Sequence, residues 1–146
     1  MYNPIGKIAA LIAAALFAGL VLFQLALAFG APWGRAAYGG FVEQPGTELR
    51  VESAIATIVW SVAGLTVLKR AGFAVWTPVP RRAVPVVVWA VVGLTALGIA
   101  PNVISPSALE RAIWLPVVVA MTALTLTVAI SSRRRDRALR PVAKTP

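Results

Sequence analysis

The side chains whose chemistry suits catalysis or binding gather between residues 35 and 52 and again at residues 110 and 111. They are arginines and glutamates: Arg35, Glu43, Glu48, Arg50, Glu52, Glu110 and Arg111. Paired carboxylates carry out acid and base catalysis, whereas carboxylates beside arginines form ion pairs. No spacing marks two of these acids as partners, so we expect ion pairs, for instance Glu52 with Arg111, and no catalytic residue.

Histidine and cysteine are both absent from the chain. Their absence excludes a histidine base, a thiol nucleophile and a thiolate metal site. We therefore expect no bound metal and no cofactor, and we favour a non-enzymatic role, with enzyme activity left open.

The stretch FGAPWGRAAYGG, residues 29–40, has the glycine and aromatic content of a binding loop. It lacks the lysine of a P-loop and the glycine spacing of a dinucleotide-binding turn. It follows directly after an apolar run, where Trp and Tyr anchor helices at the lipid headgroups, and Trp33 and Tyr38 fit that role. We predict a folded cap over the membrane part. The alternative is a binding surface for a partner or a lipid headgroup, with Arg35 as the anion contact. The candidate interaction residues of the outer loops are Trp33, Arg35, Tyr38, Glu52, Glu110 and Arg111.

A second set of polar side chains falls inside the apolar runs. It comprises Gln24, Thr57, Ser61, Thr95, Thr122 and Thr125. Hydroxyl groups in membrane helices bond to their own backbone or across to a neighbouring helix, so we interpret the set as packing. A polar conduction path is the alternative. No ionisable residue lies near the middle of any run, and such a residue is the usual mark of a transporter or proton relay.

The composition explains where these residues must sit. The chain of 146 residues is 59% hydrophobic and 13% charged, with a mean hydropathy of +0.81, whereas soluble domains average about 45–50% apolar and about 25% charged. Apolar runs near residues 8–29, 50–69, 83–100 and 112–132 approach or reach the roughly 20 residues that span a bilayer. We predict an all-α, four-helix transmembrane domain over residues 1–132, arranged as two tandem hairpins. The alternative is a cleaved first segment and three spans.

Three helix ends are legible in the sequence. Ser107 and Glu110 have the spacing of a capping box, which predicts a helix that begins at Ala108. Thr47, after Pro45 and Gly46, is the expected N-cap of the second helix. Gly72 is the expected C-terminal cap of the same helix.

Charge asymmetry predicts the orientation of the chain in the membrane. With four spans and a cytoplasmic C-terminus, eleven of the fourteen cations fall inside and three, Arg35, Arg50 and Arg111, fall outside. Cations of short loops stay on the cytoplasmic side. We therefore predict a multi-pass protein of the inner (plasma) membrane with both termini in the cytoplasm.

Residues 133–146 carry six cations, which accounts for much of the net charge of +9. We predict a disordered cytoplasmic tail that is drawn to anionic lipids, at about 1 kcal/mol per basic residue near the surface. No aromatic residue lies between these arginines, so we expect no nucleic-acid binding.

The motifs GAPWG (30–34), Gly39-Gly40 and SPSALERAIWLPV (105–117) resemble an uncharacterised family of small four-helix bacterial, mainly actinobacterial, integral membrane proteins. The resemblance implies the same four-helix fold and assigns no activity. Members often carry a histidine shortly after the double glycine. This chain has Phe41-Val42-Glu43-Gln44 there, so any role of that histidine is absent.

Three classes of function remain open on the sequence alone. We favour a non-catalytic accessory or interaction protein that works through its outer loops, with a protein partner or a second copy of itself. A small oligomeric transporter or channel is the alternative, and a membrane enzyme that acts on a lipid is a further one. The missing His, Cys and mid-membrane charge weigh against the last two.

Overall fold

The computed structural model describes the backbone of residues 4–138 and the side chains of residues 4–133. Within that range the chain is helical and contains no strand. The four long helices are α1 (Pro4–Ala28), α2 (Thr47–Ala71), α3 (Val84–Ile104) and α4 (Ala108–Ala138). Each is long and apolar enough to cross a membrane. The predicted all-α fold with four membrane-spanning helices is thus confirmed.

The helices extend beyond the apolar runs from which they were predicted. In particular, α4 continues past residue 132 to Ala138, so the predicted disordered tail is helical over its first residues. Arginine is a good helix former, and the helix propagates from the spanning segment into this stretch. Residues 139–146 of that tail lie outside the described residues.

The predicted helix ends are correct in two cases of three. α4 begins at Ala108. Gly72 adopts the left-handed conformation (φ 97°) and donates its backbone N–H to the carbonyls of Leu68 and Lys69, which caps α2. Thr47 is not the N-cap, because it is already the first helical residue. The extended Gly46 occupies the cap position, and no side chain bonds there.

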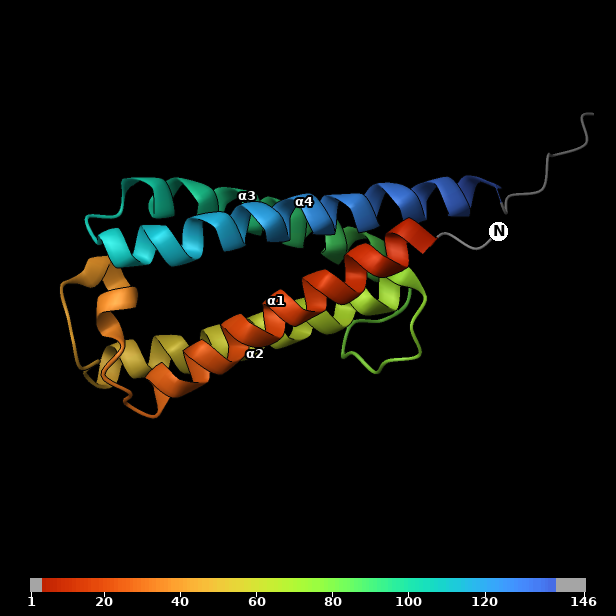
Figure 1. The fold of residues 1–146 in the computed structure, drawn as a ribbon. Coiled ribbons are helices and arrows are strands. Elements are labelled where there is room, and N and C mark those ends of the chain that lie inside the picture. The colour runs from red at the N-terminus through yellow and green to blue at the C-terminus, as the bar shows by residue number, and fades with distance from the viewer. Residues whose placement is uncertain (1–3, 139–146) are drawn as a thin grey trace, which may run out of the picture.

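The helices form two hairpins, α1–α2 and α3–α4, which lie close together at one end of the bundle and diverge toward the other (Figure 1). The first and last described residues lie at the close end, which we call the terminal end. The other end is the cap end. Residues 29–46, called the cap from here on, cross the divergent helix ends (Figure 1).

The hydrophobic core occupies the half of the bundle near the terminal end. There α1 presents a stripe of small residues, with Ala9, Ala10 and Ala13 buried beside Phe17. α2 meets the stripe with Gly64, so closely that a Cβ at that position would lie 3.0 Å from Cβ of Phe17. Small residues allow helices to approach in this way, and close packing stabilises them in lipid. The cap half of the bundle lacks such a core, and a cavity lies there instead.

Candidate functional site

The cap is an ordered segment built from two single turns of 3₁₀-helix, η1 (Gly34–Ala36) and η2 (Tyr38–Gly40). The N–H of Gly34 donates to the carbonyl of Glu43 at 3.0 Å, which folds the cap back on itself. Ala36 and Ala37 turn inward and are buried. The predicted folded cap is therefore present in the structure.

Three hydrogen bonds fasten the cap to α4 and to the residues just before it. The indole N–H of Trp114 donates to the carbonyl of Ala36 at 2.7 Å. The backbone N–H of Gly39 donates to a carboxylate oxygen of Glu110 at 3.0 Å. The hydroxyl of Ser107 donates to the carbonyl of Arg35 at 2.8 Å. The cap is thus attached firmly to the second hairpin.

Other contacts fasten the cap to the first hairpin. The hydroxyl of Tyr38 lies 2.5 Å from the hydroxyl of Ser53 and 3.1 Å from the carbonyl of Leu49, both on α2. The guanidinium Nε of Arg50 donates to the carbonyl of Ala28 at 2.9 Å, which joins the start of α2 to the end of α1. Tyr38 therefore does not point outward as a headgroup anchor. Its hydroxyl satisfies a polar group of the bundle instead, and Ser53 is almost fully buried.

The outward side of the cap presents aromatic and charged side chains. Trp33 is 52% exposed and stacks on Phe23 of α1 with ring centroids 6.2 Å apart. Arg35 pairs with Glu43 at 3.4 Å, and both side chains are largely exposed. Phe41 is 81% exposed. An exposed pair of this kind contributes little to stability, so these residues are free to contact other molecules.

The predicted ion pair of Glu52 with Arg111 is wrong. The Arg111 guanidinium donates to the carbonyl of Ser105, while Glu52 is exposed and makes no hydrogen bond or ion pair with a described residue. A carbonyl close along the chain holds the arginine without the entropy cost of ordering two long side chains.

Only one of the two hydrogen bonds of the predicted capping box forms. The N–H of Glu110 donates to the hydroxyl of Ser107 at 3.1 Å. The Glu110 carboxylate does not reach back to Ser107 and instead accepts from Gly39 and, at 2.5 Å, from the hydroxyl of Ser105. Tertiary contact with the cap has therefore replaced the local bond. Glu110 lies at the junction of cap and helix.

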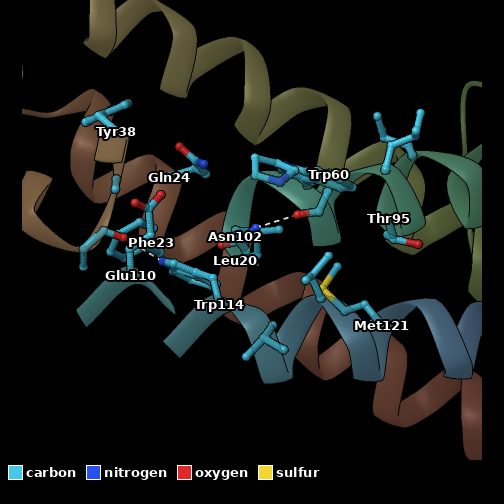
Figure 2. Close-up of a pocket in the computed structure, with 18 residues that line it drawn as sticks. Leu20, Phe23, Gln24, Tyr38, Trp60, Thr95, Asn102, Glu110, Trp114 and Met121 are labelled. Atoms are coloured by element: carbon cyan, nitrogen blue, oxygen red, sulfur yellow. Dashed lines mark hydrogen bonds between the residues drawn. The ribbon is translucent and has the colours of Figure 1, made fainter. Parts of the chain in front are cut away.

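A cavity of about 460 Å³ lies beneath the cap, between the two hairpins. Small-molecule sites measure roughly 300–1,000 Å³ and combine apolar walls with a few polar groups. Figure 2 shows Tyr38, Gln24 and Glu110 toward one end of this cavity and Thr95 and Met121 toward the other. Further walls come from Trp60 and Trp114. The polar groups are therefore concentrated beneath the cap.

The predicted intramembrane polar residues divide into two groups. Thr57, Ser61, Thr95, Thr122 and Thr125 all donate to backbone carbonyls of their own helices at 2.7–3.1 Å. Such bonds satisfy the hydroxyls without a second helix, as the packing interpretation expects.

Gln24 differs from these five residues. It lines the cavity, and its amide makes no hydrogen bond with a described residue. Its donors and acceptor are available to a ligand.

The residues of the site that were not singled out from the sequence include Trp60, Asn102 and Trp114. A tryptophan near a helix end is usually interpreted as an interfacial anchor. That interpretation does not predict the hydrogen bond from Trp114 to the cap. Trp60 could have been noticed from the sequence. It lies in the middle of a spanning helix, away from the lipid interface where tryptophan is usual. Asn102 donates to the carbonyl of Gly98 on its own helix at 2.7 Å.

The arrangement can bind molecules at two places, the outward side of the cap and the cavity. Among the described residues no three His, Cys, Asp or Glu side chains lie close enough to hold a metal ion. In comparisons with known proteins, no protein-family model, no curated protein and no solved structure matches the chain.

Proposed function

We propose that this chain is a non-catalytic accessory or interaction protein of a bacterial inner membrane, and that the outward side of its cap is the contact surface. The observation that carries the proposal is that the cap is hydrogen-bonded to both hairpins while Trp33, Arg35 and Phe41 face outward. Tryptophan and arginine dominate the binding energy of protein interfaces. A loop already held in shape loses little entropy on binding.

The two alternatives have less support. A conduction path through one chain would have to cross the packed half near the terminal end, where Val67, Val88 and Val128 are fully buried. A lipid-modifying enzyme would rely on Glu110, and no second carboxylate is among the described residues that line the cavity. We therefore rank the transporter and the enzyme below the interaction protein.

The orientation belongs to the same proposal. It places the cap outside the cell and both termini in the cytoplasm, because the loop between α2 and α3 and the C-terminal residues hold most of the cations. The bacterial source rests on the resemblance of the GAPWG and SPSALERAIWLPV motifs.

Cysteine labelling of intact cells will test the orientation. The natural chain has no cysteine, so each variant carries a single thiol. We expect a membrane-impermeant maleimide to modify the Gln44→Cys variant at the cap and to leave the Ala74→Cys variant unmodified until the cells are lysed. Both positions are exposed, so access does not bias the comparison. The reverse pattern would place the cap in the cytoplasm.

Recovery of a partner protein by a variant of the cap will test the proposed function. We expect the Trp33→Ala/Arg35→Ala double variant to recover at least tenfold less of a stoichiometric partner in a mild-detergent pull-down, because hot-spot residues each contribute about 2 kcal/mol or more. Trp76→Ala is the matched control, since Trp76 is a tryptophan at the opposite end of the bundle that is even more exposed, at 76%.

Two results would count against the interaction protein. Unchanged partner recovery by the double variant, with unchanged thermal stability, would make the cap a spacer. A stable homo-oligomer with substrate-dependent flux in liposomes would favour the transporter instead.

A further inference from the structure

The cavity is separate from the outward side of the cap, and its occupancy does not depend on the proposed partner. It is closed on three sides. The cap covers one end through the bond from Trp114 to Ala36. The rings of Phe23 and Trp114, with centroids 4.7 Å apart, close the side between α1 and α4. Met121 lies at the end nearest the core and is 1% exposed.

The wall formed by α3 contains exposed side chains. Leu94 and Leu97 of α3 line the cavity and are nevertheless 44% and 74% exposed. In a chain that spans a membrane, exposed leucines on a spanning helix face lipid tails. A molecule dissolved in the bilayer can therefore enter sideways, past α3, without crossing the cap.

The polar groups of the cavity specify one end of such a molecule. Both hydrogen bonds that Glu110 accepts end on Oε2, and its Oε1 accepts none from a described residue. A carboxylate oxygen only accepts, so it needs a donor. The Gln24 amide, also without a hydrogen bond to a described residue, lies toward the same end (Figure 2). Hydrogen bonds of a carboxylate to a charged donor are roughly twice as strong as those between neutral groups.

We propose that the cavity binds a long-chain amphiphile with an ammonium head. The ammonium donates to Oε1 of Glu110 and to the Gln24 carbonyl. The chain runs along Trp60 toward Met121 and leaves past Leu94 and Leu97 of α3. A bilayer lipid with a primary-amine head and a free long-chain amine share this chemistry.

Photolabelling will test the site on the full chain in nanodiscs of phosphatidylcholine, a lipid without a primary amine. The probe is a dodecylamine with a diazirine in its chain, and the labelled peptides are identified by mass spectrometry. We expect saturable labelling of the α3 and α4 segments that line the cavity. Unlabelled dodecylamine will compete, and dodecanoate, with the same chain and an anionic head, will compete at least tenfold less well.

The Glu110→Gln variant is expected to raise the half-saturating probe concentration at least tenfold. It keeps an oxygen acceptor for Gly39 and Ser105, so the cap stays attached. Glu48→Gln is the matched control, because Glu48 is exposed in the first turn of α2, at the same end of the bundle. If Glu110→Gln lowers the melting temperature, Gln24→Trp tests the site instead by filling the polar end, and we expect labelling of the cavity to be lost.

Nanodiscs that contain phosphatidylethanolamine will distinguish the two sources of the ammonium group. Competition by this lipid identifies a bilayer lipid as the occupant, and no competition identifies a free amine. The proposal is overturned if labelling spreads evenly over lipid-facing residues, or if dodecanoate competes as well as dodecylamine. It is also overturned if Glu110→Gln and Gln24→Trp both label like the natural chain.

Discussion

Replacing Gly34 with alanine is expected to disrupt the fold of the cap and to destabilise the protein by about 1–3 kcal/mol, the usual cost of forcing extra atoms into a packed site. A Cβ at this position would lie 2.2 Å from the carbonyl oxygen of Val42 and 3.0 Å from that of Glu43. Both obstacles are backbone atoms, which cannot rotate away as a side chain can. The hydrogen bond from the Gly34 N–H to the Glu43 carbonyl must therefore break.

Thermal unfolding in detergent will measure the loss, and limited proteolysis will show whether cleavage appears in residues 29–46. Gly46→Ala is the matched control, because Gly46 lies in the same segment and a Cβ there meets no atom within 4 Å. Equal melting temperatures for the two alanine variants would contradict the expected clash.

Replacing Gly64 with leucine is expected to force α1 and α2 apart, with a destabilisation near the upper end of about 1–3 kcal/mol. The first carbon of the new side chain would already lie 3.0 Å from Cβ and 3.4 Å from Cγ of Phe17. The remaining carbons of leucine have no space in a contact between small residues. Because close packing is a main force that holds membrane helices together, the first hairpin bears this loss directly.

The same unfolding measurement applies, with Gly93→Leu as the control. Gly93 lies within α3, and a Cβ there meets no atom within 4 Å. We expect Gly93→Leu to melt close to the natural chain. If Gly64→Leu also melts close to the temperature of the natural chain, the tight contact between α1 and α2 does not hold the hairpin together.

The spanning helices can be predicted from the sequence because the bilayer imposes one requirement on the backbone. Every backbone polar group in hydrocarbon must be bonded internally, so an apolar run of sufficient length becomes a helix. Local signals also hold where their partners are local. Gly72 caps α2 with bonds to carbonyls a few residues back, and Ser107 accepts from the N–H of Glu110.

Predictions of contacts between side chains from distant parts of the chain were less accurate. Glu52 does not meet Arg111, and the Glu110 carboxylate bonds to the cap rather than to its own helix. Tyr38 turns inward to Ser53. For each side chain the sequence offers several acceptors of similar strength, and only the packing of distant segments selects among them.

By itself, the sequence determined four apolar helices, an ordered glycine- and aromatic-rich connection after the first, and a strongly asymmetric distribution of cations. These follow from composition and from contacts within a few residues. The tertiary structure alone decided that the hairpins diverge, that the cap closes the gap between them, and that Gln24 and Glu110 lie toward the same end of one cavity. The reason is physical: the small residues that let helices approach lie in one half of the bundle, while bulky Phe23 and Trp114 lie in the other.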